Sequence, residues 1–242
     1  NDVNIMGTAN LLEILANTEH SVKKMIVASS RAIYGEGKYN CKIHGDQYPS
    51  KRKEKNMKKG EFNPKCDICN TELNLVATDE KSKIHPSSIY GINKQQQEQM
   101  VMLLGDSLGI PSVAFRYQNV YGPGQSLSNP YTGSLSIFST RILNGNNLDI
   151  YEDGLESRDF VYIDDVVDAT ILGIEKDQAN GEVFNIGSGI ATNVKEVAES
   201  LKKFYNSDIT ISISGKYRLG DIRHNYADLN KAKNLLCFTP KY

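Results

Sequence analysis

A tyrosine and a lysine, Tyr90 and Lys94, stand four residues apart in a segment whose pattern predicts a long helix over residues 88–108. Residues four apart lie on one face of a helix, about one turn from each other. A phenol ordinarily has a pKa of about 10, and a nearby ammonium group lowers that pKa by stabilising the phenolate. The pair can therefore move a proton on and off a substrate hydroxyl. The same spacing also arises by chance on helix surfaces, so its meaning depends on the motifs around it.

Three of the four cysteines fall in a short segment that contains two pairs of potential metal ligands. Cys41 is followed by His44, and Cys66 by Cys69, with two residues inside each pair. Thiolate and imidazole groups at this spacing suit a tetrahedral zinc ion, and four protein ligands leave no open position for catalysis. The surrounding residues 38–83 are charge-rich and lack core-forming periodicity, and so long a loop without structure is uncommon in a compact domain. We expect a structural zinc ion to organise this segment; the alternative is a flexible loop with free thiols.

The composition excludes several classes of protein. The 242 residues are 39% hydrophobic and 24% charged with a net charge of −1, which is typical of a globular protein with a sizeable core. The charge balance gives no overall attraction to nucleic acid or to an anionic membrane. No apolar run predicts a transmembrane helix, and the first residues do not resemble a secretion signal. With cysteines placed for metal binding, we expect a cytoplasmic protein.

An α/β fold would position the chemistry. The apolar run Met25–Ala28 predicts a strand buried on both faces, and Ser29 and Ser30 follow at its carboxyl end, where open parallel sheets bind their ligands. Helices are expected over residues 4–17, 88–108, 134–143, 164–175 and 194–205. Further strands are expected over residues 112–117, 148–151, 158–162, 182–186 and 209–213. Asn193 with Glu196 three residues on is a capping signal for the last helix. This order of elements predicts a parallel sheet.

Five motifs follow one another along most of the chain. They are SSRAIYG (29–35), YGINK (90–94), RYQNVYGPG (116–124), RDFVYIDDV (158–166) and FNIGSG (184–189). In this order they resemble the extended short-chain dehydrogenase/reductase family, specifically its nucleotide-sugar epimerases and dehydratases, over about residues 4–228. The resemblance implies a Rossmann-like, doubly wound parallel sheet that binds NAD.

The resemblance also implies a division of the chain. Residues 1–120 would be the remainder of the NAD-binding domain, interrupted by a zinc-ribbon-like insertion at 38–83. Residues 121–242 would form mainly the smaller α/β substrate-binding part, with one or more strands returning to the first sheet. The glycine-rich turn with which the family holds the dinucleotide pyrophosphate does not occur in this sequence. We therefore expect this chain to be a fragment that lacks the first half of the nucleotide-binding domain. The glycine-rich turn that usually binds NAD would be lost with that half.

The resemblance assigns roles to individual residues. Ser30 is the hydroxyl that bonds the reacting sugar oxygen, Tyr90 is the acid/base, and Lys94 binds the nicotinamide ribose and tunes Tyr90. The implied cofactor-binding residues are Asn4, Ser29, Tyr90, Lys94 and Tyr117. The implied substrate-binding residues are Ser30, Arg31, Asn119, Arg158 and Arg218. The last two arginines would hold the diphosphate, which a guanidinium group can bind through two bonds; without the resemblance, surface ion pairs would be the better interpretation.

The residues after Ser30 bear on the reaction. The family's 4,6-dehydratases carry acidic residues there for the proton transfers of elimination, whereas this chain has Arg31 and Ala32. This favours a 4-epimerase that oxidises C4 of a nucleotide-diphosphate sugar to a 4-keto intermediate and returns the hydride from NAD to the opposite face. A dehydratase is less favoured, and intact Ser30, Tyr90 and Lys94 oppose a non-catalytic scaffold that uses the insertion to bind a partner.

The sugar itself stays open. A UDP-hexose or UDP-N-acetylhexosamine is our first expectation, and dTDP-L-rhamnose is the alternative, because a similar Cys/His insertion occurs in a subgroup that resembles dTDP-L-rhamnose 4-epimerases. Residues 125–131 should help to select the sugar. We also expect a homodimer through the opening helix and the helix 88–108, as in similar enzymes, because Met100, Leu103 and Leu104 form an apolar flank that needs to be covered.

Overall fold

Three parallel strands form the sheet that positions the candidate catalytic residues. The computed structural model describes residues 2–127 and 133–242. The strands stand in the order β1-β5-β10 and span Met25–Ser30, Ser112–Tyr117 and Val183–Ile186. Ser30 of β1 and Ile186 of β10 both pair with Tyr117 of β5, so the three strands end at the same edge of the sheet.

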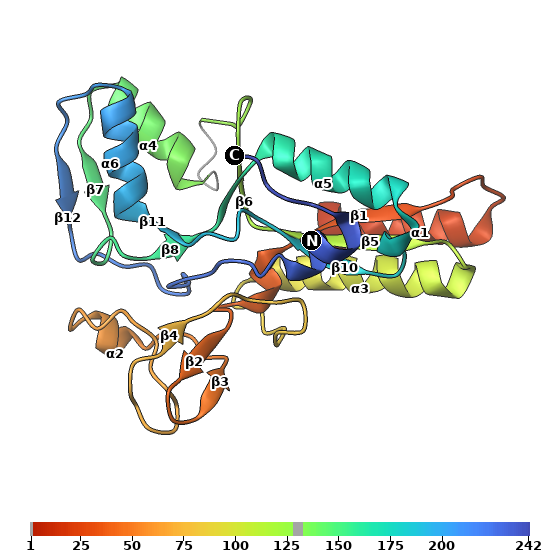
Figure 1. The fold of residues 1–242 in the computed structure, drawn as a ribbon, viewed down its shortest axis with the longest axis horizontal. Coiled ribbons are helices and arrows are strands. Elements are labelled where there is room, and N and C mark those ends of the chain that lie inside the picture. Colours follow the sequence, from red (N-terminus) through yellow and green to blue (C-terminus); the bar gives the residue numbers. More distant parts are fainter. Residues whose placement is uncertain (1, 128–132) are drawn as a thin grey trace.

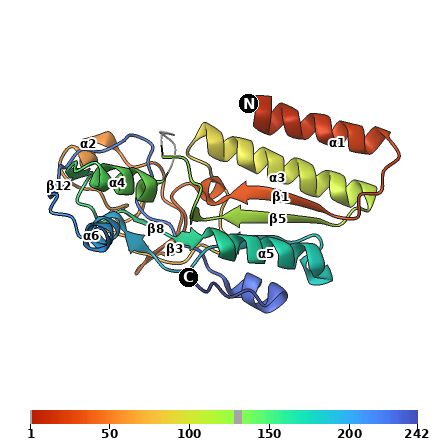
Figure 2. The ribbon, with the colours of Figure 1, turned by 90° about the horizontal axis from the view of Figure 1, so that it is seen from above.

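Helices cover both faces of this sheet (Figures 1 and 2). Figure 2 shows α1 (Gly7–Asn17) and α3 (Ile89–Leu108) on one side of β1 and β5, and α5 (Ile163–Glu175) on the other. One π-helical turn, η1 (Asp2–Met6), leads into α1, and another, η4 (Ala232–Leu236), contacts α5. The main core includes the buried side chains of Val113, Phe115, Val161, Val166, Phe184, Ile186, Leu236 and Phe238. Because helices cover both faces of the sheet, the strands are apolar without the alternation of apolar and polar residues seen in half-exposed strands.

The second half of the chain adds a smaller assembly with its own core. Its elements are α4 (Ser134–Leu143), β7 (Leu148–Ile150), α6 (Val194–Phe204) and β12 (Ile211–Ile213). Strands β7 and β12 pair in parallel, and the buried residues among these elements are Ile142, Leu148, Ile150, Ala198 and Ile209. The remaining short elements are β6 (Asn119–Tyr121), which pairs with β9 (Phe160–Tyr162), β8 (Ser157–Arg158), which pairs with β11 (Thr192–Asn193), and η3 (Asp177–Ala179).

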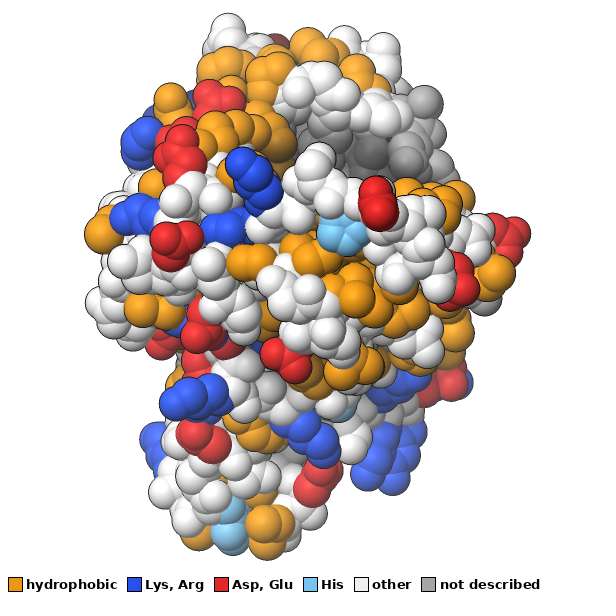
Figure 3. All heavy atoms as spheres, turned by 90° about the vertical axis from the view of Figure 1, so that its right-hand side faces the viewer, with side chains coloured by type: hydrophobic (Ala, Val, Ile, Leu, Met, Phe, Trp, Pro, Cys, Tyr) orange, Lys and Arg blue, Asp and Glu red, His pale blue; other side chains and the backbone are white. Residues whose placement is uncertain are grey.

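The Cys/His segment forms a lobe of its own. Its antiparallel strands stand in the order β3-β2-β4, and its elements are β2 (Tyr39–Cys41), β3 (Gly45–Gln47), α2 (Glu54–Met57) and β4 (Asn74–Leu75). Its core is small, with Tyr39, Cys41, Cys66 and Leu73 buried together. The lobe projects from the bottom of the molecule in Figure 1, and the space-filling view in Figure 3 shows charged side chains over its surface. Few apolar side chains therefore hold this segment together.

The prediction of an α/β fold with a parallel sheet is confirmed, and several boundaries are corrected. The opening helix becomes α-helical only at Gly7, after the π-helical turn. The strand expected over 158–162 is interrupted at Asp159, whose buried carboxylate accepts hydrogen bonds from the backbone of Ser188, Gly189 and Ala227. The predicted cap of α6 is present as a reciprocal pair between Asn193 and Glu196. No helix in the described part of the chain is long and apolar enough to cross a membrane.

Candidate active site

The carboxyl end of β1 and the first turn of α3 meet at one point. The hydroxyl of Ser88 caps α3 by accepting a hydrogen bond from Gly91 N at 3.1 Å. A Cβ at Gly91 would lie only 2.5 Å from the carbonyl oxygen of Ala32, so this position needs glycine. Ala32 belongs to η2 (Arg31–Tyr34), the 3-10 turn that directly follows Ser30. This close approach of two backbones brings Tyr90 next to the turn that begins at Ser30.

Ser30 and Tyr90 both line a cavity of about 1060 Å³. The Ser30 hydroxyl accepts a hydrogen bond from Ala32 N at 3.2 Å, which helps to fix its orientation at the strand end. The Tyr90 side chain is 50% exposed, so its phenol is accessible. A hydroxyl and a phenol in one cavity at the carboxyl edge of a parallel sheet can bind and deprotonate a substrate alcohol.

Lys94 lies one turn after Tyr90 and is tied to the strand. Its Nζ donates a hydrogen bond to the carbonyl oxygen of Ala28 at 2.9 Å and lies 6.0 Å from the centre of the Tyr90 ring. Burial lowers the pKa of Lys94 from its ordinary value. The structure therefore brings the predicted catalytic residues Ser30, Tyr90 and Lys94 together.

Arg31 presents its charge to the same cavity. Within residues 2–127 and 133–242 its guanidinium group has neither an ion-pair partner nor a hydrogen bond. Burial, with the nearby charge of Arg158, lowers the pKa of Arg31 to about 10, so the group stays protonated at neutral pH. A partly desolvated, unpaired guanidinium group favours an anionic or oxygen-rich ligand. The predicted substrate residue Asn119 also lines this cavity.

Arg158 braces the wall of the cavity. Its Nη1 donates to the carbonyl oxygens of Ser157 and Arg223 at 2.8 and 3.0 Å. Its Nη2 donates to Asp221 Oδ1 at 3.0 Å and to the carbonyl oxygen of Ile222 at 2.8 Å. Asp221 and Ile222 line the cavity, so Arg158 holds that wall from behind. Its role toward a diphosphate stays a prediction.

Besides Lys94 and Arg158, four predicted binding residues lie outside the cavity lining. The Ser29 hydroxyl donates to Glu98 Oε2 at 2.5 Å, and the Tyr117 hydroxyl is hydrogen-bonded to Thr170 Oγ1 at 2.7 Å. The guanidinium group of Arg218 lies over the Tyr151 ring, 5.3 Å from its centre, in an exposed segment. Asn4 lies in η1, which contacts α3. The side chains of Ser29, Tyr117 and Arg218 thus have their partners outside this cavity.

The cavity also contains residues that the sequence did not single out. These are chiefly Asn93, Gln118, Tyr121, Phe160, Asp221 and Ile222. Gln118 is 5% exposed, and neither its amide nitrogen nor its amide oxygen has a hydrogen-bond partner in the described part of the chain. Its position beside Asn119 in the RYQNVYGPG motif could have indicated it. Of the segment expected to select the sugar, Gln125 lines the cavity, and residues 128–131 lie outside the described residues.

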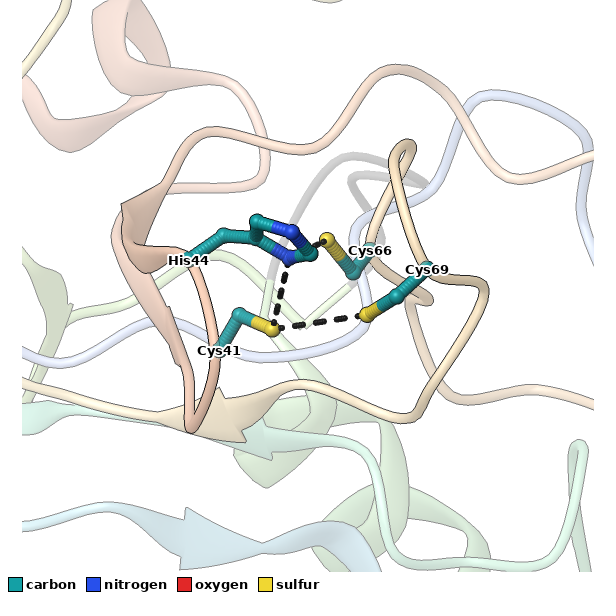
Figure 4. Close-up of side chains that lie close together, drawn as sticks. All are labelled: Cys41, His44, Cys66 and Cys69. Carbon is teal, nitrogen blue, oxygen red and sulfur yellow. Dashed lines mark hydrogen bonds between the residues drawn. The ribbon is translucent and has the colours of Figure 1, made fainter.

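The four predicted metal ligands converge in the Cys/His lobe (Figure 4). The ligand atoms of Cys41, His44, Cys66 and Cys69 all lie within 4.8 Å of one another. Cys41 Sγ is 3.6 Å from both His44 Nδ1 and Cys69 Sγ, and Cys66 Sγ is 3.5 Å from His44 Nδ1. Hydrogen bonds from the backbone of Ile43 and then from His44 lower the pKa of the Cys41 thiol to about 6. The first pair lies in the β2–β3 hairpin and the second in a separate turn.

Comparison with known proteins bears on what this geometry does. The family model for the NAD-dependent epimerase/dehydratase family matches residues 70–187. A dTDP-L-rhamnose 4-epimerase of Burkholderia thailandensis is 32% identical over 240 residues, which are 99% of this chain and 64% of the relative. The chain thus resembles the NAD-dependent epimerase/dehydratase family. The resemblance inferred from the five motifs is therefore confirmed.

Solved structures of this epimerase family have the same fold. The UDP-glucose 4-epimerase of Thermotoga maritima, solved with UDP-glucose, superposes with a TM-score of 0.77 at 34% identity, covering 99% of this chain and 65% of that one. The UDP-glucuronic acid 4-epimerase of Bacillus cereus, solved with UDP-glucuronic acid and NAD, gives a TM-score of 0.75 at 26% identity, covering 99% and 62%. The chain thus spans somewhat less than two thirds of the length of these epimerases.

Proposed function

We propose that this chain carries the catalytic residues and the sugar site of an NAD-dependent nucleotide-sugar 4-epimerase. The observation that carries the proposal is the convergence of Ser30, Tyr90 and Lys94 at the carboxyl edge of the sheet, beside a cavity of about 1060 Å³. The activities named for its relatives support it. Arg31 in place of an acidic residue after Ser30 argues against elimination of water.

In the proposed reaction Tyr90 accepts the proton of the C4 hydroxyl while Ser30 bonds the same oxygen. Lys94 stabilises the phenolate form of Tyr90, which is the base that accepts this proton. Bound NAD would supply the hydride chemistry, accepting a hydride from C4 and returning it to the opposite face of the 4-keto sugar. Tyr90 then returns its proton to the new hydroxyl. The protein holds and releases one proton in each turnover and is unchanged at its end.

We propose that Lys94 binds the nicotinamide ribose of NAD. Lys94 lines a second cavity, of about 450 Å³, between α1, β1 and α3. The lining of this cavity is mainly apolar, and its polar residues are Thr8, Lys94 and Gln97. Asn4, Ser29 and Tyr117 stay proposed cofactor residues on the resemblance alone, because the hydroxyls of Ser29 and Tyr117 are bonded to Glu98 and Thr170.

For the substrate we propose a nucleotide-diphosphate sugar whose diphosphate is bound near Arg31 and Arg158. A UDP-hexose or UDP-N-acetylhexosamine is the first candidate. The second is dTDP-L-rhamnose, which the Burkholderia relative and the Cys/His cluster favour. Arg218 would have to leave the Tyr151 ring to reach the diphosphate, so we give it the weaker role.

We propose that Cys41, His44, Cys66 and Cys69 bind one structural zinc ion. Around zinc, tetrahedral geometry separates two sulfur ligands by about 3.8 Å and a sulfur from a nitrogen ligand by about 3.6 Å. Three of the six ligand pairs are separated by 3.5 or 3.6 Å, close to these values, and all six lie within 4.8 Å. The ion would supply the cohesion that the small core of the lobe does not.

The experiment that tests the proposed function is an assay of the whole protein with NAD and a panel of sugars. The panel contains UDP-glucose, UDP-N-acetylglucosamine and dTDP-L-rhamnose, and the products are separated by their C4 configuration. We expect C4 inversion of one of these sugars without net change in NAD. Formation of a 4-keto-6-deoxy sugar instead would show a dehydratase and overturn the proposal.

A further inference from the structure

An arginine of the Cys/His lobe reaches the wall of the sugar cavity. The side chain of Arg52 is 5% exposed, and its Nη1 lies 2.7 Å from Glu152 Oε2. Its Nη2 donates a hydrogen bond to the carbonyl oxygen of Asp221 at 2.9 Å, and its Nε lies 3.5 Å from Glu36 Oε1. One guanidinium group thus joins three segments that are far apart in the sequence.

The segment that Arg52 holds is part of the cavity. Residues 220–222 line it, and the Asp221 carboxylate accepts the hydrogen bond from Arg158 described above. The next residue, Arg223, donates from its backbone N to Glu36 Oε2 at 2.8 Å. Glu36 follows the turn that carries Arg31. Displacing residues 220–223 would therefore move the groups around Arg31 as well as the cavity wall.

Arg52 is also close to the predicted zinc ligands. Arg52, Asn63, Cys66 and Asp67 line one small cavity of about 130 Å³ within the lobe. Asn63 Oδ1 in turn accepts a hydrogen bond from Arg223 Nε at 3.0 Å. Two neighbouring parts of the lobe therefore contact the same wall segment. A change in how well the chain is ordered at Cys66 therefore reaches Asp221 through the contacts of Arg52 and Asn63.

The charges around Arg52 indicate what its loss would do. Glu152 is bound by Arg223 as well, with Nη1 at 2.9 Å, so it keeps a partner without Arg52. The carbonyl oxygen of Asp221 has no second partner among the hydrogen bonds of the described residues. Removing the guanidinium group would hence release the Asp221 carbonyl while leaving Arg223 as the charge partner of Glu152. Glu36 would lose its ion pair with Arg52 and keep the hydrogen bond from Arg223 N. Loss of a partner from a fully isolated buried pair would cost much more.

We propose that Arg52 is a positioning residue that couples the metal-bound lobe to the sugar site, so that occupation of the Cys/His cluster raises the affinity for the nucleotide sugar. This inference rests on the proposed function. It adds to that function a regulation by metal, carried by one named side chain.

The test compares Arg52→Met, Arg52→Lys and a control, Lys58→Met, in the whole protein. Lys58 forms an exposed pair with Glu54 in the same lobe and does not contact the wall. The readouts are the Kd for UDP-glucose and for dTDP-L-rhamnose by calorimetry, and KM and kcat with whichever sugar turns over. We expect Arg52→Met to raise Kd and KM about tenfold with kcat within about twofold, because the chemistry at Tyr90 is untouched. Arg52→Lys should recover part of the loss, and Lys58→Met should match the wild type.

A second arm measures the coupling directly. Removing metal from the wild type with a chelator should raise the Kd about tenfold, and removing it from Arg52→Met should change the Kd little further. An equal chelator effect in both proteins would overturn the inference, as would an unchanged Kd in Arg52→Met. If Arg52→Met does not fold, the same comparison with Arg52→Lys decides. Because sugar binding gives a Kd whether or not the sugar is turned over, failure of this coupling and failure of the epimerase activity are distinguishable.

Discussion

The ammonium nitrogen of Lys94 lies 6.0 Å from the centre of the Tyr90 ring, one turn away on α3. Its hydrogen bond to the Ala28 carbonyl fixes it beside the strand that ends at Ser30. Because the ammonium group is partly buried, its charge acts on the phenol through a medium that screens less than bulk water. A chance pair on a helix surface would have neither the anchoring bond nor the burial.

Replacing Tyr90 by phenylalanine should abolish epimerisation and leave the fold intact. Only a hydroxyl is lost, from a side chain that is half exposed. General acid/base groups typically contribute at least about a hundredfold to the rate. We expect a loss of that size or more in kcat, measured in the whole protein, with a circular dichroism spectrum like the wild type. Activity within about tenfold of wild type, a barrier change below about 1.4 kcal/mol, would refute the role of Tyr90. Tyr242→Phe, at an exposed position, is the matched control.

Replacing Lys94 by methionine should lower the rate of epimerisation. The charge 6.0 Å from the centre of the Tyr90 ring and the hydrogen bond to the Ala28 carbonyl are both lost. Groups that take part in general acid/base catalysis typically contribute about a hundredfold or more, so we expect kcat/KM to fall by about that factor. Lys94→Arg, which keeps the charge, should retain part of the activity, and Lys23→Met, at an exposed position, should match the wild type. A kcat/KM within about threefold of the wild type in Lys94→Met would contradict the role of Lys94.

The parts of the site that could be predicted from the sequence are those that depend on local spacing. Ser30 follows a short apolar strand, and Tyr90 and Lys94 share one helical face, so strand and helix geometry suffices to orient them. The metal ligands were predictable for the same reason, because each pair stands on a single tight turn. Within each pair the two residues lie only a few positions apart, whereas the meeting of Cys41 with Cys69 and of Lys94 with Ala28 spans 28 and 66 positions.

The wall of the cavity could not be predicted in this way. Arg52 bonds the backbone of Asp221 across 169 positions of the sequence, and a carbonyl acceptor leaves no trace in the choice of residue. Arg218 and Asp221 stand three residues apart, yet one lies on the surface over Tyr151 and the other lines the cavity. Which of them faces the sugar is decided by long-range packing. No repeat or periodicity in that segment indicates the outcome.

The zinc site predicts a defined metal content. Protein purified without chelators should contain one zinc ion per chain by elemental analysis, and Cys66→Ser/Cys69→Ser should contain none, because two ligands do not retain the ion.

Removing zinc should loosen residues 38–83 first, seen as faster hydrogen exchange there, since this segment has little core of its own. It should also weaken substrate binding more than NAD binding. Cys237→Ser is the control, because Cys237 is exposed and lies outside the cluster. Absence of metal with freely reactive thiols at Cys41, Cys66 and Cys69 would refute the site.

The apolar side chains on α1 and α3 predict a homodimer. Of the expected flank, Leu103 is 70% exposed, whereas Met100 and Leu104 are partly buried. On the neighbouring helix α1, which lies beside α3 in Figure 2, Leu11 and Ile14 are 71% and 60% exposed. An exposed apolar patch of this kind usually marks an interface. We expect the whole protein to sediment as a dimer at micromolar concentration and Leu103→Lys to sediment as a monomer. Phe204→Lys, at an 80% exposed position on α6, should leave the dimer intact. A monomeric wild type would contradict the interface.

The free energy of unfolding should depend on pH through the Glu36 carboxyl, and replacing Glu36 should remove that dependence. Burial raises the pKa of its carboxyl to about 7, although Arg52 and a backbone N–H partly oppose the shift. Since the folded protein binds this proton more tightly than the unfolded chain, the contribution of Glu36 to stability is complete below about pH 4.5 and is lost as the pH rises through 7. Between pH 4.5 and 8 the wild type should lose up to about 3 kcal/mol of stability relative to Glu36→Gln, which keeps the acceptor for Arg223 N and cannot ionise.

Urea unfolding of the wild type and Glu36→Gln across this pH range measures the difference. Glu199→Gln, in an exposed pair with Lys195, should parallel the wild type. Parallel curves for the wild type and Glu36→Gln would show that the Glu36 carboxyl ionises in the folded protein near its ordinary pKa.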